Sequence, residues 1–235
     1  MKKQFITAII VAAGKSSRMD KAVNKQYIPL DNKPILAYSV ERFNANKNID
    51  EIIIVTASHE ADLCGKIVLN QIKAKKKIKI VVGADTRQKS VYQGLQNCRP
   101  ETTTVLIHDG ARPFVTDDMI DGCIAQMKAY QACSVGTAAI NTIKLVDKNG
   151  QVIQTLDRNK LWEVQTPQCF DYEVLFKLHK KADKAGIDDI TDDCTLAERA
   201  GLKVKMLKGN YANIKITVAQ DLVTAQSILK TIKRG

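Results

Sequence analysis

The 235-residue chain contains no long apolar run and no Cys-x-x-Cys pair, and aromatic residues make up only 5% of it. A membrane helix needs ~18 or more consecutive apolar residues, and no segment approaches that length. The six cysteines are widely scattered, unlike those of a zinc site or of a small disulfide-bonded secreted protein. We therefore expect reduced thiols, no membrane contact and a cytoplasmic location.

The N-terminal residues 1–11 have two lysines and an apolar segment, as a signal peptide does. They lead into Gly14-Lys15-Ser16-Ser17-Arg18, however, and not into a small-residue cleavage site. We therefore predict a first β-strand there.

Two common phosphate-binding motifs are also absent. Gly14-Lys15-Ser16 has Ile9 where a P-loop requires glycine, and Ser16 and Met19 occupy the second and third glycine positions of the dinucleotide fingerprint. These differences argue against a P-loop enzyme and a nicotinamide-dependent enzyme. A small-residue turn remains, with basic side chains close by. On this segment alone, a phosphate site and a solvated basic loop are equally good interpretations.

The balance of charge is strongly basic, with 36 Lys and Arg against 25 Asp and Glu and a formal net charge of +11. Such an excess predicts an anionic partner, which could be nucleic acid, an acidic membrane or a phosphorylated small molecule. The lysine-rich segment 73–79 is the obvious nucleic-acid candidate. Because no aromatic residues interleave it, a solvated turn is the better interpretation. A basic nucleic-acid-binding module stays open as the alternative class.

Short β-branched segments alternate with helical patterns along most of the chain, which predicts a parallel sheet covered by helices. Pro34 suits the first position of a helix that continues through Leu36, Val40 and Phe43. The predicted strands are 5–12, 51–56, 78–82, 104–107 and 203–208. The other predicted helices are 59–74, 88–97, 117–129, 172–185, 192–200 and 218–233.

The pattern changes near residue 136. Two β-like segments, 138–146 and 151–156, flank Asn149-Gly150, a strong hairpin signal. A hairpin inside an α/β chain usually leaves the main sheet, so we expect a protruding arm that packs on a second subunit. With no repeat or linker in evidence, residues 1–235 are interpreted as one domain with a β-arm at about 138–158.

Polar and charged residues follow several predicted strands, at the edge where parallel sheets bind ligands. Residues 83–87 follow one strand, and His108-Asp109-Gly110-Ala111-Arg112-Pro113 follows another. An Asp in this position, with cations nearby, suits Mg²⁺ bridged to phosphates, although a turn-capping Asp explains Asp109 equally well.

These motifs, taken in order, resemble those of the cytidylyltransferases of isoprenoid biosynthesis. The matching residues are Ala12-Ala13-Gly14-x3-Arg18-Met19, Lys25-Gln26, Arg87-x2-Ser90-Val91-x2-Gly94-Leu95, residues 108–113, Asp157-Arg158-x2-Leu161-Trp162, Gln165-Thr166-Pro167-Gln168-x-Phe170, Thr191-Asp192-Asp193 and 213–217. The resemblance implies an α/β fold with a Rossmann-like three-layer nucleotidyltransferase sheet flanked by helices, and a protruding β-hairpin arm for dimerisation.

The activity that the resemblance implies is transfer of CMP from CTP to methylerythritol 4-phosphate, with release of pyrophosphate. The sister family that uses ribitol 5-phosphate shares most of the motifs and is the alternative. A phosphate monoester is mostly dianionic at neutral pH, so the nucleophile needs no general base. His108 is therefore not required as a catalyst. Positioning and charge neutralisation by Lys, Arg and Mg²⁺, or another divalent cation, suffice.

The resemblance also implies roles for individual residues. Arg18, Lys25 and Lys215 would be catalytic, and Asp109 would be the metal ligand. Arg158 would reach the partner's site in a homodimer. The expected nucleotide-binding residues are Ala12, Ala13, Gly14, Arg18, Lys25, Gly83, Asp85, Ser90 and Gly110. The expected sugar-phosphate-binding residues are Asp109, Arg112, Thr142, Arg158, Thr166, Thr191 and Lys215.

Two residues depart from the family pattern. Ser16 stands where the family usually has a second glycine, and Asn24 replaces a proline before Lys25. Asn24 lacks the fixed φ of proline, so we expect a looser Lys25 loop before nucleotide binds.

Overall fold

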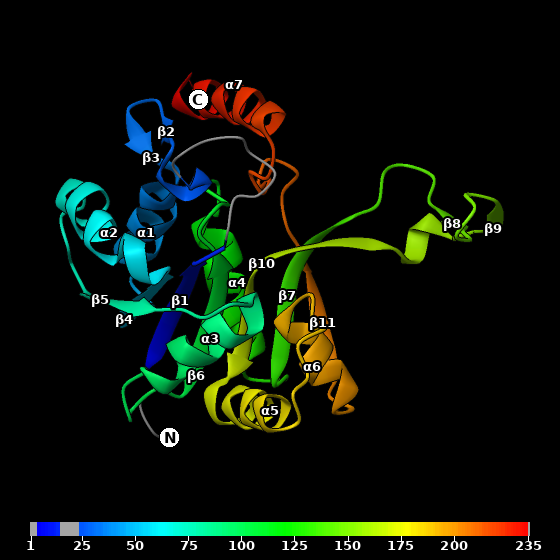
Figure 1. Ribbon diagram of the computed structural model, residues 1–235, viewed down its shortest axis with the longest axis horizontal. Coiled ribbons are helices and arrows are strands. Elements are labelled where there is room, and N and C mark those ends of the chain that lie inside the picture. The colour runs from blue at the N-terminus through cyan, green and yellow to red at the C-terminus, as the bar shows by residue number, and fades with distance from the viewer. Residues whose placement is uncertain (1–3, 15–23, 235) are drawn as a thin grey trace.

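A seven-stranded sheet forms the centre of the protein in a computed structural model that describes residues 4–14 and 24–234 (Figure 1). The strand order across the sheet is β11-β7-β10-β6-β1-β4-β5. The bounds of these strands are β1 Ile6–Ala12, β4 Glu51–Thr56, β5 Lys77–Val82, β6 Thr104–Asp109, β7 Ala132–Ala138, β10 Trp162–Asp171 and β11 Val204–Lys208.

The prediction of a parallel sheet is wrong at β10, which runs antiparallel to both β6 and β7. The sequence pattern hid this strand because Pro167 lies within it, and proline usually indicates a strand edge or a loop. The β10–β7 ladder is indeed irregular between Val164 and Gln168. The chain leaves the sheet after β7 and returns through the arm, so β10 comes back beside β7 in the opposite direction.

Helices cover both faces of the sheet, and its central strands β1, β4 and β6 are accordingly buried along nearly their whole length. Successive side chains point to opposite faces: Ile10 and Ile54 join the core under one set of helices, and Ile9 and Ile53 join the other. The first set is α1 Ile35–Ala45, α2 Ala61–Ile67 and α4 Asp117–Gln126. The second set is α3 Arg87–Gln96, α5 Tyr172–Lys184 and α6 Asp193–Arg199.

The C-terminal helix, α7 Ala219–Arg234, packs away from the sheet. Its Ala225 and Leu229 meet Leu30 of the short β2–β3 pair, which spans Pro29–Leu30 and Lys33–Pro34. Most predicted elements agree with the structure to within a few residues. In the described parts of the chain, no helix is both long and apolar enough to cross a membrane.

Two helix predictions need correction. The predicted helix 59–74 is divided into a 3₁₀ turn Ser58–Glu60, α2, and a second 3₁₀ turn Leu69–Gln71. Gly65 and the β-branched Val68 have low helix propensity, which favours a short helix here. Pro34 precedes the first helical residue instead of occupying it.

The predicted hairpin is present, as strands β8 Lys144–Val146 and β9 Val152–Thr155, and it projects away from the sheet (Figure 1). Asp147 Oδ1 accepts hydrogen bonds from the backbone N–H groups of Asn149 and Gln151, which fixes the turn. The predicted strand 138–146 is too long, because β7 ends at Ala138 and β8 begins only at Lys144. A 3₁₀ turn, Arg158–Lys160, completes this arm before β10 begins.

Candidate active site

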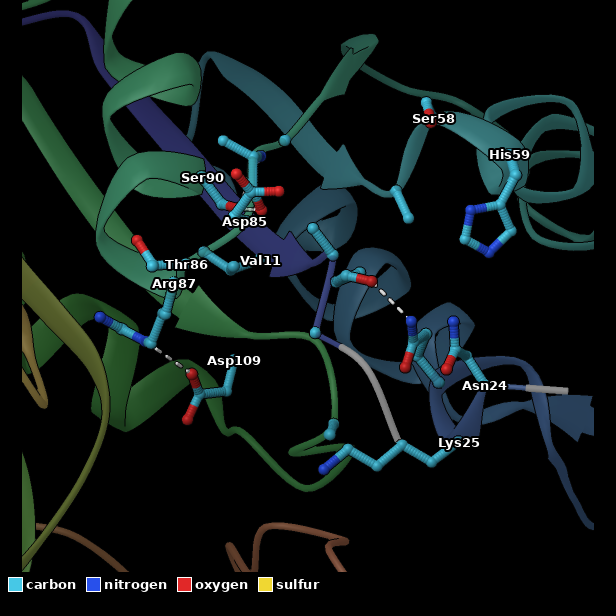
Figure 2. A pocket seen from close by; sticks show the side chains of 18 of the residues that line it. Val11, Asn24, Lys25, Ser58, His59, Asp85, Thr86, Arg87, Ser90 and Asp109 are labelled. Carbon is cyan, nitrogen blue, oxygen red and sulfur yellow. Dashed lines mark hydrogen bonds and ion pairs between the residues drawn. The ribbon is translucent and has the colours of Figure 1, made fainter. Parts of the chain in front are cut away.

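A cavity of about 440 Å³ opens at the carboxyl edge of β1, β4, β5 and β6, where their parallel strands end together (Figure 2). It brings together most of the predicted site residues that the structure describes. The lining contains Ala12, Ala13, Gly14, Lys25, Gly83, Asp85, Ser90, Asp109 and Lys215 from that set, with Arg87, Ser58 and His59 in addition.

One wall of the cavity is built from small residues packed at close range. A Cβ atom on Gly83 would lie 2.8 Å from both the Ala13 methyl carbon and Ser90 Oγ, so no larger residue fits without movement. Ser90 Oγ also accepts from Ala84 N–H at 3.0 Å and donates to Ala84 O at 3.1 Å. These contacts fix the turn after β5 and leave backbone available to a flat ligand.

Gly110 lies in the equivalent turn after β6. Its N–H donates to Val11 O at 2.9 Å, and a Cβ atom at this position would lie 2.8 Å from Leu36 Cδ1. The backbone of the two neighbouring turns is therefore held together. Gly110 itself does not line the cavity, and its nucleotide-binding role stays a prediction.

Asp109 lies at the floor of the cavity between three cations. Its Oδ2 is 2.9 Å from Lys215 Nζ and 3.4 Å from Arg112 Nε, and its Oδ1 is 3.4 Å from Arg87 Nε. Burial acts to raise the pKa of this carboxyl, but the charges of Arg87, Lys215 and Arg112 outweigh it and hold the pKa far below its usual range. Asp109 is thus an anion at every pH at which the protein works.

Thr166 and Arg112 are fixed next to Asp109 by a buried histidine. The backbone N–H of Asp109 donates to Thr166 Oγ1 at 3.0 Å, and that oxygen lies 2.9 Å from His108 Nδ1. His108 Nε2 lies 3.1 Å from the backbone oxygen of Arg112. Burial lowers the pKa of His108 to about 4. The imidazole is therefore neutral near pH 7 and positions its neighbours.

The Lys25 loop is tethered on the opposite wall, where Figure 2 shows Lys25 extending across the cavity. Asn24 donates to buried Glu60 Oε1, and Gln26 Nε2 donates to Ala12 O at 2.6 Å. Asn24 has φ −59°, which proline could also adopt. Asn24 does not restrict φ as proline would, but its side-chain hydrogen bond to Glu60 restrains the loop that we expected to be looser. Arg18 and Ser16 lie outside the described residues.

Five of the seven expected sugar-phosphate residues do not line the cavity. Arg112 and Thr166 still contact Asp109, whereas the other three lie elsewhere. Thr191 is exposed in the turn before α6, and Thr142 and Arg158 are exposed on the arm. Arg158 Nη1 donates to Ile140 O at 3.0 Å, across the base of the arm. A single chain therefore gathers most of the expected nucleotide residues but not the whole expected sugar-phosphate site.

Arg87 has no role predicted from the sequence, although it belongs to one of the matched motifs. Arg87 bridges Asp109 and the buried Asp193, whose carboxylate oxygen Oδ2 lies 2.7 Å from Arg87 Nη1. The two motifs are 106 residues apart, and nothing in their local pattern predicts that they meet. Ser58 and His59 were also missed, because they carry no motif.

The side chains of the cavity are better suited to a metal ion that the protein and the substrate bind jointly than to one bound by protein ligands only. Among residues 4–14 and 24–234, no group of three or more His, Cys, Asp or Glu side chains could hold an ion. Mg²⁺ usually binds through one or two carboxylates together with substrate phosphates. The single carboxylate of Asp109 is enough for such a site, because an ionised carboxylate has about four acceptor positions.

Comparison with known proteins gives one consistent result. The model of a family described as 2-C-methyl-D-erythritol 4-phosphate cytidylyltransferase (IspD) matches residues 6–231. The enzyme of that name from Caldanaerobacter subterraneus subsp. tengcongensis is 44% identical over 225 residues, covering 96% of this chain and 99% of the relative.

Solved structures show the same relationship. The crystal structure of 4-diphosphocytidyl-2C-methyl-D-erythritol synthase from Anaerococcus prevotii is 32% identical, with a TM-score of 0.86 over 97% of this chain and 96% of that one. The Francisella tularensis 2-C-methyl-D-erythritol 4-phosphate cytidylyltransferase is 30% identical, with a TM-score of 0.79 over 96% and 100% of the two chains.

Proposed function

The chain belongs to the 2-C-methyl-D-erythritol 4-phosphate cytidylyltransferase family, and we propose from this premise that it transfers CMP from CTP to 2-C-methyl-D-erythritol 4-phosphate. The products are 4-diphosphocytidyl-2-C-methyl-D-erythritol and pyrophosphate. The observation that best supports the proposal is the cavity, which combines a close-packed small-residue wall at Gly83 with the cations around Asp109.

In this reaction an oxygen of the sugar phosphate forms a bond to the α-phosphorus of CTP, and the bond from that phosphorus to the pyrophosphate oxygen breaks. The nucleophile arrives ionised, so the protein has to align two anions and neutralise the charge of the transition state. Lys25 and Lys215 both line the cavity and are suited to this role.

Lys215 changes partners in this mechanism. Without ligand its ammonium pairs with Asp109 Oδ2 at 2.9 Å, and a bound phosphate competes for the same charge. Arg112 is less free to move than Lys215, because it also donates to the backbone oxygens of Asn213 and Val164. Lys215 is therefore the cation that transfers to the reacting phosphates, while Arg112 stays near Asp109 and orients the sugar phosphate.

Asp109 would hold the divalent cation. When bound, that ion neutralises phosphate charge and lowers the repulsion between the two substrates. Asp109 also presents its carboxylate to the sugar hydroxyls, with Thr166 fixed beside it.

A substrate comparison tests the proposed activity directly. Purified protein with Mg²⁺ and CTP should release pyrophosphate when methylerythritol 4-phosphate is added, and only weakly with ribitol 5-phosphate. The reverse preference would assign the chain to the ribitol alternative, which the comparisons do not favour. Absence of turnover with both substrates would contradict the proposal.

The proposed active form is a homodimer in which the arm of each subunit reaches the site of the other. Apolar side chains on and beside the hairpin are left in solvent: Ile140 is 60%, Val152 59% and Ile153 63% exposed. Several large apolar residues exposed on one projecting segment favour an interface there. The arm also carries Thr142 and Arg158, which the cavity of a single chain lacks.

A mixing experiment tests the shared site. Arg158→Ala and Lys215→Ala are each expected to be nearly inactive as homodimers. In a mixed dimer, one site receives both defects and the other receives neither. Equal mixing after reversible dissociation should therefore restore about a quarter of the wild-type activity, as expected for random pairing in a two-fold dimer. No recovery, despite mixed dimers detected by mass, would place Arg158 in its own subunit's site.

We place the protein in the cytoplasm, where thiols stay reduced. All six cysteines are free, and five of them are buried. Its substrates are the two phosphorylated small molecules, and no nucleic-acid role is needed to account for the cations at the site.

A further inference from the structure

Two residues of the matched motifs remain without a function in this mechanism: Arg87 at the start of α3 and Asp193 at the start of α6. The structure joins them by an ion pair. Arg87 Nη1 lies 2.7 Å from Asp193 Oδ2, and the Asp193 side chain is 1% exposed. A pair this short and this buried is expensive to place unless its polar groups are well satisfied.

Besides Arg87, Asp193 has two further hydrogen-bond partners, one at its side chain and one at its backbone N–H. Its second oxygen, Oδ1, accepts from His179 Nε2 at 2.9 Å, and its backbone N–H donates to Gln168 Oε1 at 3.1 Å. His179 is itself buried on α5 and stacks on Tyr92 of α3 at 12° between the rings. Three helices and β10 therefore fix the position of this carboxylate.

The opposite edge of the Arg87 guanidinium points to the active site. Its Nε lies 3.4 Å from Asp109 Oδ1, so one planar cation connects a structural carboxylate to a functional one. Only arginine provides donors on two edges in this fixed geometry. The result is a continuous chain of contacts, His179–Asp193–Arg87–Asp109, that runs from the α5 side of the sheet to the cavity floor.

The three cations around Asp109 are anchored differently. Lys215 is the most exposed of them, at 37% of its side chain, and Arg112 is otherwise anchored to neutral backbone oxygens. Arg87 alone among these three is anchored to a second buried carboxylate. When phosphates attract Lys215, Arg112 and Arg87 both remain beside Asp109, and Arg87 is the one that a second carboxylate holds in place.

We propose that Arg87, Asp193 and His179 are positioning residues that keep the Asp109 carboxylate in place when Lys215 turns to the phosphates. This inference rests on the proposed function, because it concerns how Asp109 meets the sugar phosphate and its cation. It predicts that loosening the chain at its far end harms the chemical step more than it harms nucleotide binding.

Asp193→Asn is the first test, because the amide keeps the shape of the side chain and removes its charge. We expect kcat to fall about 10-fold, since a small misplacement of a reacting group has a large effect on rate. The Kd of CTP, measured by calorimetry without turnover, should change less than about threefold, because the small-residue wall at Gly83 is not touched. The same titration gives the stoichiometry of CTP binding, and kcat is expressed per CTP-binding site. A pure folding defect would lower that stoichiometry and leave kcat per site unchanged, which would overturn the inference.

A double-mutant cycle shows whether Asp193 acts through Arg87. Arg87→Met is expected to lower kcat more than Asp193→Asn does, and adding Asp193→Asn to Arg87→Met should cause little further loss. Independent sites instead give additive effects. Equal losses from Asp193→Asn in both backgrounds would overturn the inference.

Arg199→Met is the matched control, since it removes another Arg–Asp pair from the same helix, α6. Arg199 donates to both oxygens of Asp189 at 2.8 and 2.9 Å, but the pair is exposed. Its kcat should equal that of the wild type. A 10-fold loss there would mean that any loosening of α6 is sufficient, and would contradict a specific role for Asp193.

His179→Gln provides a second variant if Asp193→Asn does not fold by circular dichroism. It lies one step further from the cavity, so we expect a kcat loss of about threefold, with CTP affinity unchanged. A wild-type kcat in folded His179→Gln would exclude His179 from the chain. Failure of the inference is distinct from failure of the proposed function, because the latter would show as an inactive wild-type protein.

Discussion

The cavity and the arm differ in nearly every physical respect, although both contain residues expected to meet the same sugar phosphate. The cavity is charged and closely packed: Asp109 is surrounded by three cations, and Gly83 has no space for a methyl group. The arm is thin, and its apolar residues Val152 and Ile153 lie in solvent. A single chain therefore forms the cavity by itself but leaves the apolar residues of the arm exposed to solvent.

This difference indicates where the positioning of substrate comes from. In the cavity, each functional side chain is fixed by buried neighbours of its own chain, as His108 fixes Thr166. On the arm, within the described part of the chain, the Arg158 side chain donates only to the nearby backbone oxygen of Ile140. The cavity is thus preorganised by folding, whereas the arm would be ordered for function by assembly in the proposed homodimer.

The largest effect should come from removing a cavity cation. Lys215→Ala and Lys25→Ala are each expected to lower kcat/KM by ~100-fold or more, the scale of losing one preorganised transition-state contact. Steady-state pyrophosphate release measures this. Lys205→Ala is the matched control because Lys205 is exposed on β11, and its kcat/KM should be unchanged. Retained activity in Lys215→Ala would remove the role assigned to that lysine.

Charging the arm tests whether assembly completes the site. Ile153→Glu places a charge on a side chain that is 63% exposed in the single chain, and Ile232→Glu does the same at 56% exposure on α7. For an isolated subunit both changes should be nearly neutral. If the arm is an interface, only Ile153→Glu should dissociate the dimer in light scattering and lower activity about 10-fold or more. Equal behaviour of the two variants would contradict the arm interface.

The acid stability of the buried network distinguishes it from exposed ion pairs. Burial raises the pKa of Asp193, but the Arg87 charge and the His179 hydrogen bond outweigh this and lower the pKa from 3.8 to about 2. The ionised form stabilises the fold above pH 4, and this stability is lost as the pH falls towards 2. The loss amounts to about 2 kcal/mol.

Urea unfolding of the wild type and Asp193→Asn between pH 5 and 2 measures this contribution. The difference in their free energies of unfolding should change across that range by the amount expected for Asp193. The matched control is Asp189→Asn, whose exposed pair with Arg199 should produce a much weaker pH dependence. Parallel curves for the wild type and Asp193→Asn would show that Asp193 does not titrate as described.

The smallest effect concerns the loop that carries Lys25. Asn24→Ala removes the hydrogen bond to Glu60 and should raise KM for CTP by about threefold, the scale of one net hydrogen bond. Asn24→Pro also removes that bond but fixes φ near the observed −59°. Its KM should therefore lie closer to the wild-type value. Equal KM values for Asn24→Ala and Asn24→Pro would mean that backbone restriction at this position is irrelevant.

The regions with regular local patterns were predicted well. The β-branched segments of β1, β4 and β6, the hairpin at Asn149-Gly150 and most helices need only their own side-chain periodicity, so the sequence indicates them directly. The position of Asp109 at a strand end, near a small-residue turn, was also predicted, because parallel strands end at the same sheet edge.

The errors have a common cause, which is a contact between distant parts of the chain. Pro167 concealed β10, whose strand conformation is imposed by β6 and β7 on either side. The Arg87–Asp193 pair joins two helix starts that neither local segment predicts. The sugar-phosphate role of Thr191 stays a prediction, because this residue is exposed outside the cavity of the single chain.

The sequence alone determined most of the elements, the family and the functional residue types of this protein, because periodicity, turn chemistry and ordered motifs are local properties. Tertiary structure decided which charges meet. Asp109 obtains its three cations from α3, from the turn after β6 and from the segment after β11, and only the order of strands in the sheet brings these segments together. Of the basic residues behind the net charge of +11, the three around Asp109 act most strongly, because burial strengthens their interaction with this carboxylate. Solvent screens the exposed basic residues.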